Sequence, residues 1–169
     1  HKLRTWDPTT GTVHVYLGSS AGFSGIEFDD PGESAQLNQP KMVWISQLDE
    51  NFVYILDMRN ERIRLLDRAG WVVNTIAGNG EKDYCGDGGP ALEACFNFPK
   101  NANPEPGGAI VPNADETKLY VADPENHIIR VIDLVAGTID LLAGGPGEAG
   151  DVDGAGTDAR FHYPTSFAL

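Results

Sequence analysis

The stretch Asp123-Pro-Glu-Asn-His-Ile-Ile-Arg130 recurs in variant form along this chain. An earlier copy reads Asp57-Met-Arg-Asn-Glu-Arg-Ile-Arg64, and His1-Lys-Leu-Arg4 matches the end of a further copy. The matching arginines are 60 and 66 residues apart. Similar segments at a regular interval indicate a repeat architecture, in which each repeat is one supersecondary unit that packs against its neighbours.

Each copy is followed by the same turn residues. An Asp comes three residues after each arginine, and a Gly comes eleven residues after that Asp. Short segments that begin with this Asp and end with a Gly are typical of hairpin turns, because Asp bonds its own backbone and Gly adopts a positive φ. The three segments are Asp7-Pro-Thr-Thr-Gly11, Asp67-Arg-Ala-Gly70 and Asp133-Leu-Val-Ala-Gly137.

Apolar runs of four to six residues surround each copy and are bounded by Gly, Pro, Asn and Asp, which is typical of β-strands. One short stretch, residues 89–96, could form a single helical turn opened by Pro90. The predicted strands are Leu3–Asp7, Val13–Leu17, Met42–Ile45, Phe52–Leu56, Ile63–Leu66, Val72–Ile76, Ala109–Val111, Leu119–Ala122, Ile128–Ile132, Ile139–Leu142 and Ser166–Leu169.

The strands group into units of four. Each unit is followed by a long connection that ends in an apolar residue, two further residues and a proline, as in Phe96-Asn-Phe-Pro99. Four strands with a long return to the next unit are typical of a β-propeller blade. We therefore expect an all-β fold, a partial β-propeller, with blade segments at residues 1–18, 40–78, 107–144 and 164–169.

Propellers typically have at least four blades, and this chain holds two complete ones. We therefore expect it to be part of a longer chain or to assemble with other chains that complete the ring. One irregularity interrupts the repeat, because Pro40 to Asp57 spans 17 residues whereas Pro99 to Asp123 spans 24. The extra residues are predicted to form a loop at 101–108, which is rich in Pro and Gly.

The Asn126-His127-Ile128 triplet, within its Asp-x-x-Asn-x-x-Ile-Arg frame, resembles the signature of the NHL repeat. The loop Gly86-Asp-Gly-Gly-Pro-Ala91 and the Phe96-x-x-Pro99 phrase are similar to the connections of that family. The second copy departs from the signature, because Glu61 stands where the family has His. The resemblance implies a propeller, commonly of six blades, that serves mostly as a binding platform.

Members of this family and more distant propellers differ in function. Some NHL propellers bind RNA through a basic face, whereas others are extracellular adhesion modules or lie beside a thioredoxin-like domain. Certain distant propellers are enzymes, among them a zinc-dependent amidating lyase and calcium-dependent lactonases. Such enzymes hold a metal in the central channel, and the inner strands predicted here, 42–45, 109–111 and 166–169, contain no His, Asp or Glu.

Charge and hydropathy exclude two classes of partner. The chain has 12 basic and 25 acidic residues, a net charge of −13, and no clustered basic patch of the kind that binds phosphate backbones. We therefore expect no nucleic-acid binding. No apolar run approaches the roughly 18 residues of a membrane helix, so we expect no direct membrane insertion.

The repeated polar residues of the motif are predicted to be structural. Short polar residues in tight turns commonly satisfy backbone groups, and an Asp and an Arg on neighbouring strands can form an ion pair. The histidines lack metal-ligand spacing, so His127 is also predicted to be structural. These residues are Asp57, Asn60, Arg64, Asp123, Asn126, His127 and Arg130.

Two loops depart from the repeat. Cys85 and Cys95 can close a short disulfide in an oxidising compartment, or remain two free thiols in a reducing one. The acidic turn with Asp151, Asp153 and Asp158 resembles the opening of a calcium loop, but its twelfth position is His162 rather than a bidentate Glu. A solvated turn is the favoured interpretation, and we expect no cofactor.

The leading hypothesis is a non-catalytic binding or structural module that presents its loops to a protein or glycan partner, at a cell surface or outside the cell. One alternative is part of a propeller enzyme of the lyase or lactonase type, with its catalytic ligands in other blades. Another is an intracellular scaffold beside a redox domain, for which reduced Cys85 and Cys95 would be evidence.

Overall fold

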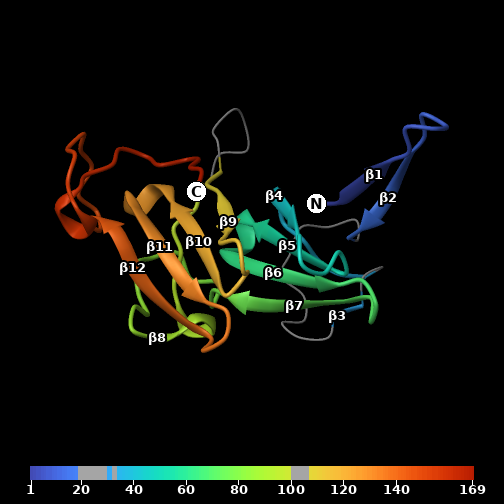
Figure 1. Cartoon of the computed structure of the whole chain (residues 1–169), viewed down its shortest axis with the longest axis horizontal. Helices are drawn as coiled ribbons and strands as arrows, with labels where there is room; N and C mark the ends of the chain where they lie inside the picture. The colour runs from blue at the N-terminus through green and yellow to red at the C-terminus, as the bar shows by residue number, and fades with distance from the viewer. Residues whose placement is uncertain (19–29, 32–33, 100–106) are drawn as a thin grey trace.

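The computed structural model describes residues 1–18, 30–31, 34–99 and 107–169. The described part of the chain is all-β and contains one two-stranded and two five-stranded sheets, all antiparallel (Figure 1). The predicted loop at 101–108 lies outside the described residues except for Gly107 and Gly108. No helix of the described residues is long and apolar enough to cross a membrane.

Two of the sheets have the strand order of propeller blades. One runs β4-β5-β6-β7-β3 and the other β9-β10-β11-β12-β8, while β1 and β2 form a separate hairpin. The strands are β1 (Leu3–Trp6), β2 (Val13–Leu17), β3 (Asp30–Pro31), β4 (Pro40–Ile45), β5 (Phe52–Asp57), β6 (Arg62–Asp67), β7 (Val72–Ala77), β8 (Gly89–Pro90), β9 (Ile110–Pro112), β10 (Lys118–Asp123), β11 (Ile128–Asp133) and β12 (Thr138–Gly144).

Among the described residues, four short 3-10 turns join or follow these strands. They are η1 (Met58–Asn60), η2 (Ala91–Glu93), η3 (Pro124–Asn126) and η4 (Gly156–Asp158). The helical turn predicted within 89–96 is present as η2, directly after Pro90. The repeated motif itself contains η1 and η3, each closed by a residue in the left-handed conformation.

The structure differs from the predicted strands in two places. Each blade carries a fifth strand, because the connection that enters a blade pairs with its outermost strand, β3 with β7 and β8 with β12. The strand predicted at Ser166–Leu169 is wrong, since these residues form no strand. No described strand lies in register beside them, and an extended segment without a hydrogen-bonded partner is not a strand.

The main core lies between the two blades. One face of the β4–β7 sheet packs against the facing side of the β9–β12 sheet, and the connection between them adds Phe96 and Phe98, whose rings stack 5.2 Å apart. The opposite face of the β4–β7 sheet buries a second cluster against the β1–β2 hairpin. The β4–β7 blade therefore buries apolar side chains on both faces, as stacked blades require.

The repeated glycine is explained by a close approach of two backbones. Gly18, Gly78 and Gly144 all have positive φ, at 103°, 96° and 98°. A Cβ atom at these positions would lie 2.7, 2.3 and 2.6 Å from the carbonyl oxygens of His1, Glu61 and His127, respectively. Any other residue would clash with the backbone just before β1, β6 or β11, the strands that follow the three copies of the motif turn. The spacing from arginine to glycine therefore follows from the strand pairing.

Candidate functional site

The motif aspartates fasten each connection to the blade that follows it. Asp123 accepts a hydrogen bond from the backbone N–H of Asn97 at 2.9 Å and another from the Asn126 amide at 2.9 Å. In the earlier copy, Asp57 accepts the same two bonds, from the Asn38 N–H and from Asn60, both at 2.7 Å. Burial raises the pKa of each aspartate to about 6, although these hydrogen bonds act in the opposite direction.

The motif histidine accepts a hydrogen bond from the residue before the next connection's proline. The backbone N–H of Tyr163 donates to Nδ1 of His127 at 3.2 Å, and the N–H of Gln39 donates to Nδ1 of His1 at 3.3 Å. Burial and the neighbouring His162 lower the pKa of His127, which favours the neutral ring that this contact requires. The histidine thus joins one blade to the next connection.

In the copy that lacks the histidine, Glu61 accepts the equivalent hydrogen bond. Its Oε2 accepts from the backbone N–H of Phe98 at 2.9 Å, and its Oε1 lies 3.4 Å from the Lys82 ammonium. Glu61 is 6% exposed, and burial raises its pKa to about 7. A side-chain acceptor at this position, rather than an imidazole as such, is what the repeat needs.

The pKa of Glu61 predicts that substitution with glutamine changes how stability depends on pH. A folded-state pKa above the unfolded value means that the folded protein holds the extra proton, so stability falls as pH rises from about 4.5 to about 7. Glu61→Gln keeps an acceptor for Phe98 and removes this charge. The difference in free energy of unfolding, variant minus natural protein, should be about 1–2 kcal/mol larger at pH 8 than at pH 5. The variant is therefore relatively more stable at the higher pH.

Denaturant titrations at the two pH values measure this difference. Glu148→Gln is the matched control, since Glu148 pairs with Arg160 at the surface and its side chain is 62% exposed. The control removes one carboxylate of a surface ion pair, so it should change the free energy of unfolding by about 1 kcal/mol or less at either pH. A Glu61→Gln profile that runs parallel to that of the natural protein would contradict the role assigned to Glu61.

The motif arginines do not both pair as predicted. Arg64 lies 3.7 Å from Asp57 of the neighbouring strand, which agrees with a structural ion pair. The expectation that Arg130 pairs with Asp123 is wrong, because the guanidinium of Arg130 turns to the incoming connection and pairs with Asp87 at 2.5 Å. The connection offers carbonyl groups as well as a carboxylate, and a guanidinium with five donors can bind them together.

Arg130 also clamps the loop that contains the cysteines. Its guanidinium donates to the carbonyl oxygen of Cys95 at 2.7 Å and to that of Cys85 at 2.9 Å. The two cysteines form a disulfide with an S–S distance of 2.02 Å. Arg130 has no exposed surface, so this loop supplies partners for a fully buried charge.

The acidic turn contains no assembled metal site. Asp151, Asp153 and Asp158 are all exposed, and Asp158 lies in η4. In the part of the chain that the structure describes, no group of three or more His, Cys, Asp and Glu side chains is placed to share an ion.

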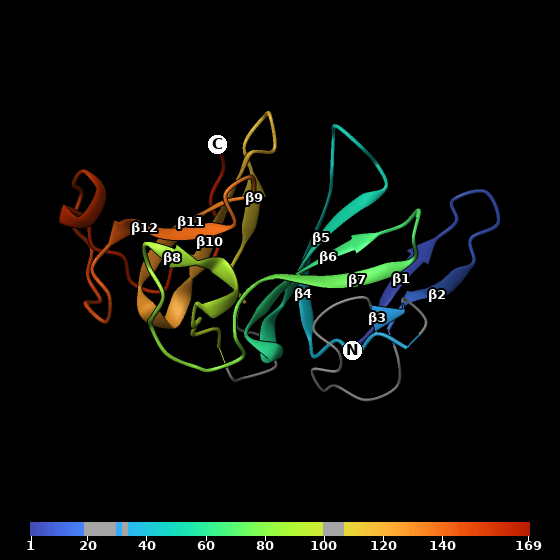
Figure 2. The same ribbon diagram turned by 90° about the horizontal axis from the view of Figure 1, so that it is seen from below.

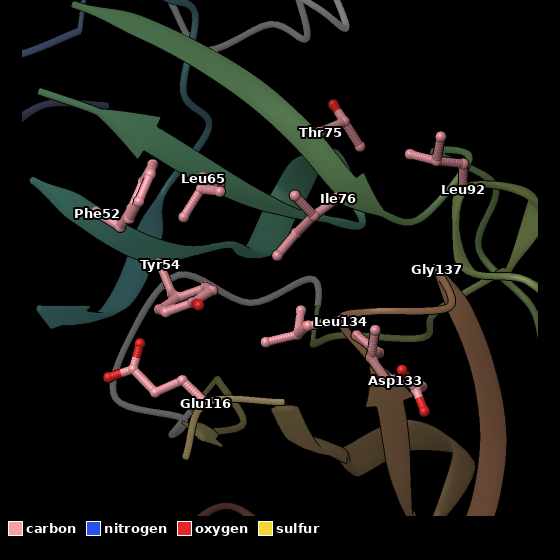
Figure 3. Close-up of a pocket in the computed structure, with 11 residues that line it drawn as sticks. Phe52, Tyr54, Leu65, Thr75, Ile76, Leu92, Glu116, Asp133, Leu134 and Gly137 are labelled. Atoms are coloured by element: carbon pink, nitrogen blue, oxygen red, sulfur yellow. The ribbon is translucent and has the colours of Figure 1, made fainter. Parts of the chain in front are cut away.

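The joint between the two blades contains a pocket of about 400 Å³. Phe52, Tyr54 and Leu65 of one blade face Leu134 of the next across it (Figure 3). Leu92, from η2 in the connection, lies at its side with 40% of its surface exposed. Most of the lining is aliphatic or aromatic, which is typical of ligand-binding clefts of this size.

Glu116 fixes the geometry at one side of the pocket. It comes from the β9–β10 loop and accepts a hydrogen bond at 2.7 Å from the backbone N–H of Gln47, in the β4–β5 loop of the other blade. Burial raises the pKa of Tyr54, and the Glu116 carboxylate, with which its hydroxyl hydrogen-bonds, raises it further. A hydrogen bond between loops of the two blades therefore borders the pocket.

Sequence reasoning missed this pocket. Its residues come from seven separate strands and turns, so no spacing along the chain connects them. The one signal available was the pair of acidic residues in each of two corresponding loops, Asp49-Glu50 and Asp115-Glu116.

Comparison with known proteins identifies the repeat. The chain is 31% identical to NHL repeat-containing protein 2 of Bos taurus over 156 residues, which cover 90% of this chain and 20% of that protein. The chain is an NHL-repeat propeller segment. It is also 33% identical to Protein SUPPRESSOR OF QUENCHING 1, chloroplastic, of Arabidopsis thaliana. That alignment has a length of 210 and covers 89% of this chain and 19% of the relative. It thus spans about a fifth of the length of these curated relatives.

The NHL-repeat fold also agrees with a solved structure. The chain superimposes with a TM-score of 0.62 on an auxiliary nutrient binding protein from Bacteroides thetaiotaomicron, at 22% identity, with 97% of this chain and 36% of that one covered. At this identity the match supports the fold. No family model matches the chain.

Proposed function

We propose that this NHL-repeat segment is a non-catalytic binding platform, and that a protein or glycan partner engages it at the pocket between the two blades. The observation that carries the proposal is the pocket itself, about 400 Å³ in volume, with an apolar lining and a partly exposed Leu92. Clefts between structural units are common binding sites, and an exposed leucine in such a cleft favours a contact with a partner.

The loops around the pocket suit this role. The β4–β5 and β9–β10 loops project from the same side of the molecule (Figure 2), and the Gln47–Glu116 hydrogen bond joins them. A binding surface that is fixed in advance loses little conformational entropy when a partner binds. The joint between blades therefore combines apolar surface with a preformed shape.

We further propose that the segment works at a cell surface or outside the cell. The Cys85–Cys95 disulfide supports this location, because disulfides persist in oxidising compartments and are rare in reducing ones. Alkylation of free thiols in intact cells, before lysis, tests the location. Protection of both cysteines is expected, and alkylation of both would contradict it.

Photo-crosslinking tests the binding site. A photoreactive residue is placed at position 92 in the pocket, and at position 152 as a control, where Val152 is 54% exposed and is not part of the pocket lining. A discrete adduct from position 92 is expected, with loss of that adduct when Leu134→Asp is added. The adduct is identified by mass spectrometry and its binding is reconstituted with purified components.

Two results would overturn the proposal. One is equal labelling from positions 92 and 152, which would mean that the pocket is not a preferred contact. The other is metal-dependent turnover of a small molecule by the purified protein, which would favour a propeller enzyme.

A further inference from the structure

The face that contains the pocket is strongly acidic. Five turn segments of the chain, 7–12, 46–51, 67–71, 113–117 and 133–137, join the strands at this end of the blades and hairpin. Together they contain one arginine, Arg68, and seven carboxylates: Asp7, Asp49, Glu50, Asp67, Asp115, Glu116 and Asp133. A surface with this imbalance attracts cationic partners and repels anionic ones.

The lining of the pocket is also acidic. Of the eleven described residues that line it, two are acidic, Glu116 and Asp133, and none is basic. Asp133 uses Oδ1 to accept from the backbone N–H groups of Val135 and Ala136, at 3.0 and 2.8 Å. Within the described part of the chain, its Oδ2 accepts no hydrogen bond, so that oxygen is free to accept one from a partner.

The floor of the pocket selects for aliphatic rather than sugar surface. Leu65, Ile76 and Leu134 are only partly buried and complete the edge of the interblade core. Tyr54 is 7% exposed, so little of its ring is open to the stacking that a sugar ring would need, and Phe52 is the one aromatic residue of the lining that is partly exposed. Aliphatic walls offer no hydrogen-bond partners to sugar hydroxyls, and burial of such groups without partners is unfavourable.

We propose that the pocket takes a protein segment in which an aliphatic side chain is flanked by lysine or arginine. This inference rests on the binding function proposed above and names the chemistry of the partner. The aliphatic side chain fills the space between Leu65 and Leu134, and the basic neighbours lie against Asp133 and the acidic turns. Because the carboxylates lie at the surface, salt weakens the binding.

Selection from a peptide library tests the inference. A randomised, displayed library is selected on the purified protein at low salt, and each enriched peptide is synthesised and measured by calorimetry. Enriched peptides are expected to carry Lys or Arg beside Leu, Ile, Val or Met, and to bind at least tenfold more weakly in 0.5 M salt than in 50 mM salt.

Matched substitutions then locate the site. Leu92→Lys should weaken the enriched peptides at least tenfold, whereas Leu142→Lys should not, although the two leucines are similarly exposed, at 40% and 42%. Asp133→Asn should weaken them about threefold to tenfold, because one charge is lost while the turn keeps an acceptor. Asp153→Asn, in the exposed acidic turn, should have no effect.

The outcomes separate this inference from the binding function beneath it. Enriched peptides that depend on Leu92 but are neutral or acidic would overturn the inference and leave the pocket a binding site. A glycan that binds in a Leu92-dependent way would do the same. Failure to obtain any peptide whose binding depends on Leu92 would overturn the inference, and equal crosslinking from positions 92 and 152 would remove the function as well.

Discussion

Substitution of Arg130 with alanine is expected to lower the free energy of unfolding by about 3–5 kcal/mol, the usual effect of breaking a buried charge pair. The guanidinium is fully buried and satisfies the Asp87 carboxylate together with the carbonyl groups of Cys85 and Cys95. It also lies over the ring of Phe96, 5.3 Å from the centroid. Alanine would remove a donor from the carboxylate and from both carbonyl groups, and it would open a cavity between the blade and the connection.

Chemical denaturation measures the effect, and two further variants make it specific. Arg130→Lys should restore little of the stability, because a single ammonium group cannot reach both carbonyls and the carboxylate in the geometry of a guanidinium. Arg160→Ala is the surface control. Its ion pair with Glu148 lies at the surface, where such pairs contribute about 1 kcal/mol or less. Equal losses of unfolding free energy for Arg130→Ala and Arg160→Ala would contradict the stabilising role assigned to Arg130.

Removal of the disulfide is the second large effect. Cys85 and Cys95 are ten residues apart in sequence. Closing a loop of this size lowers the conformational entropy of the unfolded chain, which raises the free energy of unfolding by about 3 kcal/mol. The Cys85→Ala/Cys95→Ala double variant should lose about this amount. The loop whose carbonyl groups accept hydrogen bonds from Arg130 would also become more mobile. The loss of stability is therefore expected to be largest in the connection between the blades.

Thermal unfolding with and without a reductant measures this loss. The natural protein should unfold at a lower temperature in the reductant, whereas the double variant should be insensitive to it. Hydrogen exchange should show the increased opening in residues 79–95 before the rest of the sheet. An unchanged unfolding temperature after complete reduction would mean that the disulfide adds nothing to the stability of the joint.

Most of the fold could be predicted from the chain because strands and turns are local. The Asp-to-Gly turns at residues 7, 67 and 133 hold their hydrogen bonds within two or three residues, so the sequence contains the information. The fifth strand of each blade was missed because β8 is only two residues long and pairs with β12, almost fifty residues away. Gly89-Pro90 shows no strand pattern, and tertiary contact alone places it.

The contacts between blades were less accessible to sequence reasoning. The motif predicts that Asp123 and Arg130 are structural but not that Arg130 turns to Asp87, which is 43 residues away. The sequence shows that Glu61 stands where the other copies have His127 and His1, but their shared role was hidden, because an imidazole and a carboxylate share only the ability to accept a hydrogen bond. The pocket was missed for the same reason, since its residues meet only when two blades pack.

Methyl NMR of the protein, titrated with the partner segment captured at position 92, tests the central claim most directly. The account predicts that the largest shifts appear on the methyl groups of Leu65, Ile76, Leu92 and Leu134, which line the joint between the blades. Leu142 and Val152, exposed outside the pocket, should stay unchanged. Shifts concentrated on Leu142 and Val152, with the pocket methyl groups unaffected, would contradict the assignment of this pocket as the binding site.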